Sequence, residues 1–222
     1  MLTQAQPLSG ISFADRPETL YVDARKVADA LGWEVVWEEA TQRLSINNKV
    51  ITSPSSVRRL LDGTALLVVG ALRSLGGDVS WEPSSGTVTV KSGAHTIQIV
   101  RGAKRVEVDC ATQRLQAWQG ETLVLETPVS TGGAGHRTPT GDFTAGPVKE
   151  RMHYSSLYNG APMPYSVQVS GNIFIHGFTS VPRFPASHGC IRVPLNKGNP
   201  ARWFYEWVDR GTPIRIQGRW QG

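Results

Sequence analysis

Two residues late in the chain have types and spacing that suit covalent catalysis. His176 ends the apolar run Ile173–Ile175, and Cys190 follows a loop that is rich in glycine and proline. A cysteine thiol titrates at about 8.5 and only its thiolate attacks a carbonyl well, so a neighbouring imidazole that accepts the proton activates it at neutral pH. The pair therefore indicates a nucleophile and its base.

Two short strands are expected to bring this pair together. Residues 173–175 are apolar enough for a buried strand, and Cys190 opens a second short strand over residues 190–193. The loop between them would return the second strand alongside the first, so that His176 meets Cys190. The carbonyl of Gly177 is a candidate for orienting the imidazole, because the third group of such a site need not be a carboxylate.

The residues around the cysteine predict a site that stabilises a developing anion. Gly189 directly precedes Cys190, where a side chain would crowd an incoming carbonyl group. The backbone N–H groups of Gly189 and Cys190 are expected to form an oxyanion hole. Spacing alone thus supports an acyl transferase or a hydrolase that uses a cysteine and a histidine.

A zinc site is the main alternative interpretation of the same residues. His176, His188 and Cys190 are chemically adequate ligands, and His188 and Cys190 would share one face of an extended segment. Structural zinc needs a further ligand, however, and the sequence has neither a Cys-x-x-Cys pair nor a His-Glu-x-x-His motif. We therefore expect no metal and no other cofactor.

The stretch from His176 to Arg192 resembles the signature of the L,D-transpeptidase (YkuD-like) family, enzymes that cross-link bacterial peptidoglycan. That signature is His-Gly, followed after a short loop by Ser-His-Gly-Cys-hydrophobic-Arg. Some members carry asparagine where this chain has Arg192. The resemblance covers residues 104–217, because further landmarks of the family have counterparts at 106–118, 129–132, 138–143 and 163–165.

The resemblance implies roles for the residues of the motif. Cys190 would be the nucleophile and His176 its base, with Ser187, His188 and Gly189 as motif residues and His188 beside the oxyanion hole. The implied reaction passes through a cysteine thioester and forms 3-3 cross-links between stem peptides. Two alternatives stay open, an L,D-carboxypeptidase that hydrolyses the same thioester and a wall-binding protein without catalysis.

Residues 144–171 lack periodicity and are rich in Gly, Pro and Tyr, so we expect a long loop that forms a wall or lid over the thiol. Its larger side chains would either line the cleft or pack the loop down; they are Tyr154, Tyr158, Met163 and Tyr165. Arg192 and Arg183 are candidates for attracting the carboxylate of the substrate. A structural role suits Arg192 equally well.

The first half of the chain contains an internal repeat. Residues 20–46 align without a gap with residues 64–90. Each copy predicts a helix followed by a hairpin, with Asp23 capping the first helix and Gly32 ending it. The equivalent residues Trp37 and Trp81 are expected in the core, the alternative being platforms for sugar rings.

The repeat resembles the copper amine oxidase N-terminal-like module, which is found attached to secreted bacterial enzymes and implies no copper. We therefore expect two domains. Residues 1–101 would form this small α+β module, and residues 102–222 a mainly β sandwich or barrel with one C-terminal helix. That helix should begin at Pro200 after the cap Asn199 and end at Gly211, followed by a strand over residues 212–217.

Composition narrows the partners and the location. The net charge of +5 favours acidic partners, among them the carboxylate-rich wall polymer and its stem peptides, and the sequence has no nucleic-acid motif. Only two cysteines are present, which argues against a disulfide scaffold. The sequence has neither a leader nor a transmembrane run. A wall-acting enzyme is nevertheless expected in the cell envelope, periplasmic or extracellular, with its leader absent from this sequence.

Overall fold

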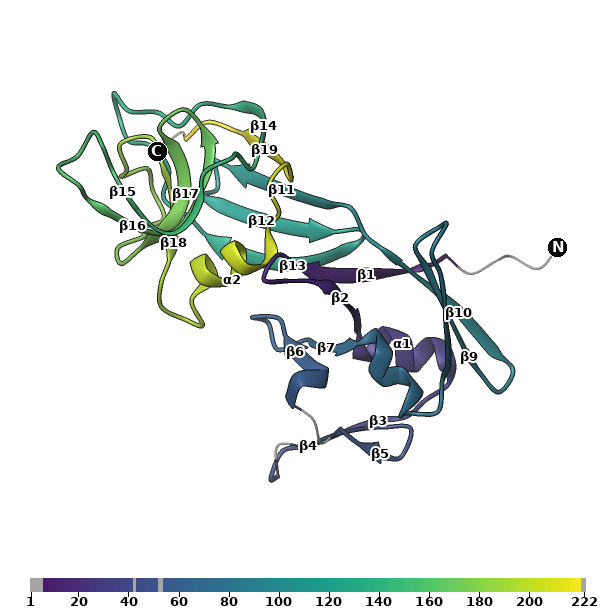
Figure 1. Ribbon diagram of the computed structural model, residues 1–222. Helices are drawn as coiled ribbons and strands as arrows, with labels where there is room; N and C mark the ends of the chain where they lie inside the picture. Colours follow the sequence, from purple (N-terminus) through teal and green to yellow (C-terminus); the bar gives the residue numbers. More distant parts are fainter. Residues whose placement is uncertain (1–5, 42, 52–53, 221–222) are drawn as a thin grey trace. The chain divides into compact units, whose positions relative to one another are not determined.

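The computed structural model describes residues 6–41, 43–51 and 54–220, in which the chain is mainly β (Figure 1). It divides into two compact units. Unit 1 ends at Gly102 and unit 2 begins at Ala103, except that Phe13–Asp15 group with unit 2. No helix among the described residues has the length and apolar character needed to cross a membrane.

Unit 1 contains a seven-stranded sheet in the order β6-β7-β2-β1-β10-β9-β8 and a separate three-stranded sheet in the order β3-β4-β5. The strands of the larger sheet are β1 (Leu8–Phe13), β2 (Arg16–Asp23), β6 (Val57–Arg59), β7 (Ala65–Val68), β8 (Asp78–Glu82), β9 (Thr87–Ser92) and β10 (His95–Arg101). The smaller sheet consists of β3 (Val35–Glu38), β4 (Arg43–Ile46) and β5 (Lys49–Val50). Short 3-10 helices are η1 (Pro54–Ser56) and η2 (Val69–Arg73).

The helix predicted for the first copy of the repeat is confirmed as α1 (Ala24–Leu31). The carboxylate of Asp23 accepts hydrogen bonds from the backbone N–H groups of Arg25 and Lys26, at 2.9 and 3.1 Å. Gly32 ends the helix with a φ of 67°. Both ends of α1 thus follow from local capping rules.

The second copy departs from this pattern, and the helix predicted there is wrong. It contains only the five-residue 3-10 helix η2, which has no side-chain cap. Leu67 stands where the first copy has Asp23, so no carboxylate is available to cap. Val69 and Gly70, which are poor helix formers, occupy the first turn. The hairpin that follows is confirmed as β8 and β9.

The two equivalent tryptophans are not in the core, so that prediction is also wrong. Trp37 is 37% exposed and Trp81 is 55% exposed. Val35 on β3 still packs against the core, but Trp37 lies two residues nearer the end of the strand. The buried tryptophan of this unit is Trp33, which donates from Nε1 to the hydroxyl of Ser92 at 2.9 Å.

Unit 2 contains a five-stranded sheet in the order β13-β12-β11-β19-β14 and a four-stranded sheet in the order β15-β16-β17-β18 (Figure 1). The first consists of β11 (Lys104–Asp109), β12 (Arg114–Gln119), β13 (Thr122–Pro128), β14 (Gly141–Thr144) and β19 (Pro213–Gln217). The second consists of β15 (Lys149–Tyr154), β16 (Pro162–Ser170), β17 (Ile173–Phe178) and β18 (Ile191–Pro194). The helix of this unit is α2 (Pro200–Trp207).

Residues 144–171 do not form the long loop that we expected. Strands β15 and β16 pair antiparallel over most of this range, and β16 continues the sheet to β17. Pro162 and Pro164 argue against a strand in the sequence, and Tyr165 interrupts the alternation because its φ is 56°. The sequence pattern therefore does not indicate these strands, because the two prolines and Tyr165 make β16 irregular.

Helix α2 begins as predicted but ends earlier. The Asn199 side chain accepts a hydrogen bond from the backbone N–H of Arg202 at 2.9 Å, and Pro200 opens the helix. The sequence predicts that the helix ends at Gly211, but its last residue is Trp207, because the backbone of Val208 is already extended. A left-handed glycine is thus not what ends this helix.

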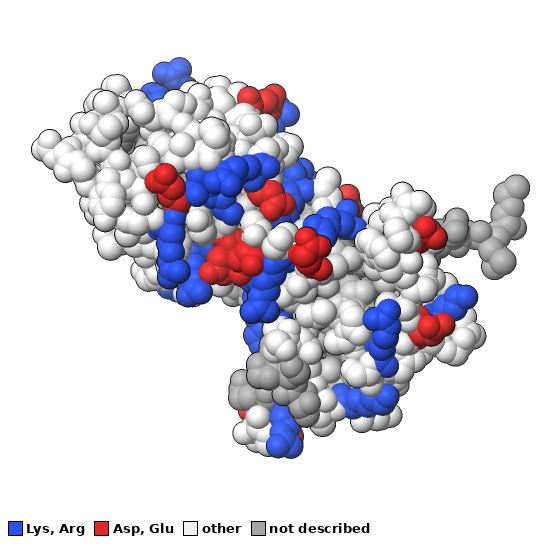
Figure 2. Space-filling view, in the orientation of Figure 1, with Lys and Arg blue, Asp and Glu red and all other residues white. Residues whose placement is uncertain are grey.

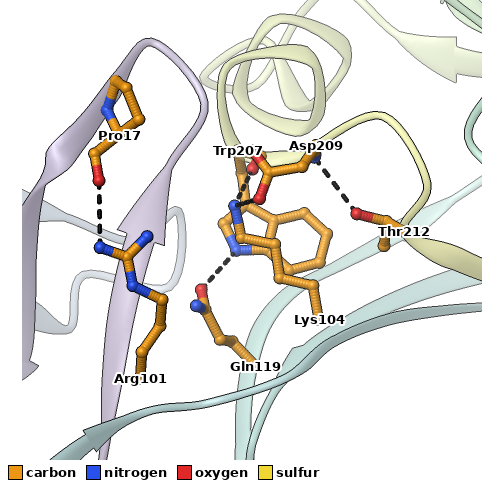
Figure 3. A network of polar contacts seen from close by, with 7 residues as sticks. All are labelled: Pro17, Arg101, Lys104, Gln119, Trp207, Asp209 and Thr212. Carbon is orange, nitrogen blue, oxygen red and sulfur yellow. Dashed lines mark hydrogen bonds and ion pairs between the residues drawn. The ribbon is translucent and has the colours of Figure 1, made fainter. Parts of the chain in front are cut away.

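A lysine from the start of β11 binds the end of α2 (Figure 3). The ammonium of Lys104 lies 2.5 Å from the carbonyl oxygen of Trp207 and 2.9 Å from the carboxylate of Asp209. The indole N–H of Trp207 donates to the amide oxygen of Gln119 at 3.0 Å. The carbonyl oxygen of the last helical residue thus accepts a hydrogen bond from a charged side chain. That side chain comes from a distant strand, so only the tertiary fold brings it to the helix end.

Candidate active site

Strands β17 and β18 lie side by side, as the sequence predicts, and the structure shows that they pair in parallel. Ile175 is in register with Ile191, and His176 is in register with Arg192. Side chains alternate between the two faces of a sheet, so His176 and Arg192 share one face. The same alternation, continued to the residue two before Arg192, predicts Cys190 on that face.

His176 is held in one tautomer by its own strand. Its side chain is buried, with 4% of the residue exposed, and Nδ1 lies 3.0 Å from the carbonyl oxygen of Gly177. A carbonyl oxygen can only accept, so Nδ1 carries the hydrogen and Nε2 is the free proton acceptor. Burial lowers the pKa of His176 to about 4, with the Gly177 carbonyl opposing this and the Arg192 charge adding to it. The imidazole is therefore neutral at neutral pH.

Gly177 has a packing reason to be glycine. A Cβ atom there would overlap the Leu195 side chain and lie 3.2 Å from the Cβ of Ala201 on α2. The carbonyl that orients His176 is thus held against the helix. A larger residue would have to displace the Leu195 side chain and press on Ala201.

Cys190 directly precedes β18 and is half-buried. Its Sγ donates to the carbonyl oxygen of Asn172 at 3.5 Å. Burial raises the pKa of the Cys190 thiol, while the backbone of Phe174 and the charge of Arg192 act in the opposite direction. Burial therefore favours the neutral form of both groups, the thiol of Cys190 and the imidazole of His176.

The loop before the cysteine is fixed by the Ser187 hydroxyl. It donates to the carbonyl of Cys190 at 2.5 Å and accepts from the backbone N–H of Gly189 at 3.1 Å. The Gly189 amide is therefore occupied, which corrects the expectation that it helps to form an oxyanion hole. Among the described residues, nothing accepts a hydrogen bond from the Cys190 N–H, so this donor remains available for an oxyanion.

Gly189 itself is required for a reason other than the one expected. Its φ is 117°, a conformation that side chains disfavour, and a Cβ would lie 2.8 Å from Cδ1 of Ile173. Thr138 holds the same residue from the other side, because its hydroxyl donates to the Gly189 carbonyl at 2.7 Å. That hydroxyl also accepts from the N–H of Gly132 at 2.8 Å.

Sequence reasoning gave no role to Thr138 or to the neighbouring Ser130. The backbone of Ser130 exchanges hydrogen bonds of 3.1 and 3.0 Å with Arg192. Both residues lie in the ranges 129–132 and 138–143 that resemble family landmarks. Those ranges were the signal that could have found them.

His188 is surrounded by two rings from other parts of unit 2. Its ring centroid lies 5.0 Å from that of His136 and 4.7 Å from that of Tyr158, which belongs to the turn between β15 and β16. His136 was assigned no role from the sequence. Another unassigned histidine, His153 on β15, stacks on Phe174 at 4.6 Å. No sequence motif marks either contact.

Of the four predicted substrate contacts, Arg192 lies at the site. Its guanidinium stacks over the Phe178 ring at 4.2 Å and is in register with His176. The cation–π contact holds the charge in place on the strand beside the buried His176. The stacking supports the structural role that the sequence offered for Arg192.

The other three residues make contacts of their own. Tyr165 faces Tyr205 on α2, with ring centroids 6.0 Å apart. Met163 is buried, with 7% exposed. Arg183 is exposed and borders a separate hollow of about 100 Å³ that also includes Glu126. The left-handed backbone at Tyr165 changes the face of the sheet on which the following side chains of β16 lie. Regular strand alternation does not predict this change.

Neither cysteine is in a disulfide, and Cys110 is a buried residue directly after β11. No group of three or more His, Cys, Asp or Glu residues in the described part of the chain is placed to hold a metal ion. His188 instead contacts Tyr158 and His136.

Comparison with known families agrees with this geometry. The L,D-transpeptidase catalytic domain (YkuD) matches residues 103–216, more than half of the chain. The chain belongs to this family. The comparison with curated proteins gives no match.

Solved structures of L,D-transpeptidases are similar to the chain. The one from Stackebrandtia nassauensis is 28% identical with a TM-score of 0.48, covering 54% of this chain and 58% of that one. The one from Xylanimonas cellulosilytica is 30% identical with a TM-score of 0.46, covering 52% and 61%. The one from Mycobacterium smegmatis is 16% identical with a TM-score of 0.46, covering 96% and 100%. In the first two, the match spans less than two thirds of the relative's length.

Proposed function

We propose that this L,D-transpeptidase family member cross-links peptidoglycan stem peptides through a thioester on Cys190. The observation that supports it most is the tautomer of His176, whose Nδ1 binds the Gly177 carbonyl and whose Nε2 is left to accept a proton. His176 lies on the strand paired with the segment that Cys190 opens. A base fixed in this way next to a thiol is the arrangement that acyl transfer requires.

In the first half of the reaction, Sγ of Cys190 attacks the carbonyl that joins the third stem residue, a diamino acid, to the terminal D-alanine. Nε2 of His176 takes the thiol proton in the same step. The Cys190 N–H faces the oxyanion. The carbon–nitrogen bond then breaks, His176 gives its proton to the departing amine of D-alanine, and the thioester remains.

In the second half, the side-chain amine of a neighbouring stem attacks the thioester. His176 takes a proton from that amine and returns it to the sulfur as the carbon–sulfur bond breaks. The product joins two third-position residues in a 3-3 cross-link. The neutral state of the resting imidazole suits both halves, because each begins with the acceptance of a proton.

The surrounding residues take supporting roles in this proposal. Ser187, Gly189 and Thr138 hold the loop that carries the thiol. His188, between His136 and Tyr158, would border the space that the substrate enters. The Arg192 charge would attract the carboxylate of a stem peptide.

Hydrolysis of the same thioester, as in an L,D-carboxypeptidase, differs only in the acceptor. The test is incubation of the protein with a disaccharide-tetrapeptide, followed by separation and mass analysis of the products. A cross-linked dimer is expected. Disaccharide-tripeptide alone would show a hydrolase, and unchanged substrate with a folded, reduced protein would favour a wall-binding role without catalysis.

The proposal extends to the organisation of the chain and its location. We assign residues 1–101 to a copper amine oxidase N-terminal-like module that contacts the glycan of the wall, and residues 102–222 to the catalytic domain. The boundary between the units at Gly102 and the repeat in the first half support this division. Because peptidoglycan lies outside the cytoplasm, the site of action would be the cell envelope. Fractionation of the native cell tests this.

A further inference from the structure

Unit 1 has a hollow of its own, with a volume of about 440 Å³. It lies between the small sheet, the start of α1 and the β6–β7 hairpin, since residues from each of these elements line it. Val35, Leu44 and Ala65 form apolar walls. The remaining lining includes Trp37, Arg25 and Arg59. An aromatic ring and two guanidinium groups thus border one partly apolar space.

The ring of Trp37 is partly exposed, and two contacts hold it in position. Its indole N–H donates to the carboxylate of Glu39 at 2.6 Å, and the guanidinium carbon of Arg59 lies 4.7 Å from the ring centroid. These two contacts restrict the ring while 37% of the residue stays exposed. Its repeat equivalent, Trp81, is more exposed but does not line the hollow.

Two arginines and one carboxylate, that of Asp23, line the hollow, and the Glu39 carboxylate lies outside the lining against the Trp37 indole. Within the described part of the chain, neither Arg25 nor Arg59 is paired with a carboxylate. The one acidic residue of the lining, Asp23, already accepts two backbone N–H groups at the start of α1. A carboxylate that entered the hollow would therefore meet two arginines.

We propose that this hollow binds a carboxylate carried on a sugar or on a short peptide. Arginine pairs with carboxylates through two parallel hydrogen bonds, and the apolar walls with the Trp37 ring suit the body that carries the carboxylate. The wall polymer offers two sources, the muramic acid carboxyl of glycan stripped of its stems and the terminal carboxyl of a stem. The inference rests on the proposed function for this choice of polymer.

Binding is measured by isothermal titration calorimetry on the full chain that carries Cys190→Ala, so that turnover does not intervene. The two probes are glycan oligosaccharides freed of stem peptides by an amidase and a disaccharide-tetrapeptide. Trp37→Ala and Arg59→Gln are each expected to weaken binding at least tenfold, and Trp37→Phe is expected to retain most of it. Trp81→Ala is the matched control, and circular dichroism with thermal melting checks that every variant is folded.

Binding of stripped glycan that Trp37→Ala weakens identifies the sugar carboxyl as the ligand of the hollow. Because the proposed catalytic site takes the tetrapeptide probe as well, binding of that probe alone identifies the stem terminus as the ligand only when Trp37→Ala and Arg59→Gln weaken it. Unaltered affinity in Trp37→Ala and Arg59→Gln overturns the proposal. So does equal weakening by Trp81→Ala, or failure of the Cys190→Ala protein to bind either probe. Thioester formation in the unaltered chain is scored separately, so failure of the proposed reaction is distinguishable from failure of this site.

Discussion

Nδ1 of His176 lies 3.0 Å from the carbonyl oxygen of Gly177, the next residue of the same strand. The contact uses no other side chain, so the tautomer of the base is set by backbone geometry. Gly177 in turn packs against the Leu195 side chain, which a Cβ at Gly177 would overlap, and against Ala201 of α2, which that Cβ would approach to 3.2 Å. The orientation of the imidazole therefore depends on the packing between β17 and α2.

The pH dependence of turnover should reflect the buried state of His176. Burial lowers its pKa to about 4, and the base must be unprotonated to act. We expect kcat/KM to stay high as the pH falls below the ordinary value of 6.5 and to decline only close to 4. Initial rates from pH 3.5 to 8 test this, with circular dichroism as the control for folding. A decline centred at 6.5 would contradict the assignment.

Stability should depend on pH through the same group. The unfolded chain protonates His176 near 6.5, whereas the folded chain does so near 4, so the unfolded state binds more protons in this window. The free energy of unfolding should therefore fall by about 3 kcal/mol from this residue as the pH falls from 7 to 4. Urea unfolding at both pH values should show this loss reduced in His176→Gln.

A matched control for the stability experiment is His136→Gln, because His136 is exposed. It should keep the loss seen in the unaltered chain. If His176→Gln loses as much stability as His136→Gln between the two pH values, the imidazole of His176 is not buried in the way described.

Replacing Gly189 by alanine should disable catalysis. The change costs on the order of 1–3 kcal/mol, because side chains rarely adopt a φ of 117°, and it places the new Cβ 2.8 Å from Cδ1 of Ile173. We expect kcat to fall at least tenfold. Gly135→Ala is the control, since Gly135 has a φ of 77° with open space around it and should lose stability without losing kcat. Equal kcat in the two variants would be evidence against a constrained loop.

The hydroxyl of Thr138 should matter more than its size. Thr138→Val keeps the shape but leaves the Gly132 N–H and the Gly189 carbonyl without their partner, at a cost of about 1–3 kcal/mol. Thr138→Ser keeps the hydroxyl. We expect thermal melting and kcat to be reduced in the valine variant and largely retained in the serine variant. Similar losses in both would indicate that packing of the methyl group dominates.

Local patterns in the sequence predicted the parts of the fold that depend on local physics. The cap Asp23 and the left-handed Gly32 bound α1, and Asn199 begins α2, as expected. The apolar run before His176 forms β17, and the segment after Cys190 forms β18 beside it. Each of these follows from residues within a few positions of one another.

The features that sequence reasoning missed depend on distant residues. Lys104 binds the end of α2 from 103 residues away, so the early stop at Trp207 could not be predicted. The positive φ of Tyr165 breaks the alternation of β16, so the sequence pattern does not indicate a strand there. Trp37 is exposed because β3 packs against the core only at Val35, two residues earlier. At the site, the contact between Tyr158 and His188 exists only once β15 and β16 form their hairpin.

The distribution of surface charge does not point to one binding surface. On the face drawn in Figure 2, basic and acidic side chains are interspersed, without a continuous basic stripe. The net charge of +5 therefore does not identify a partner by itself. Specific groups, among them Arg192 and Arg59, have to be tested one by one.

The most direct test of the thioester is the mass of the intact protein after incubation with a disaccharide-tetrapeptide. The unaltered chain and the Cys110→Ala control should gain the mass of the disaccharide-tripeptide acyl group, with D-alanine released. Cys190→Ala should gain nothing. An adduct that persists in Cys190→Ala, or its absence from the folded and reduced unaltered protein, would contradict the account.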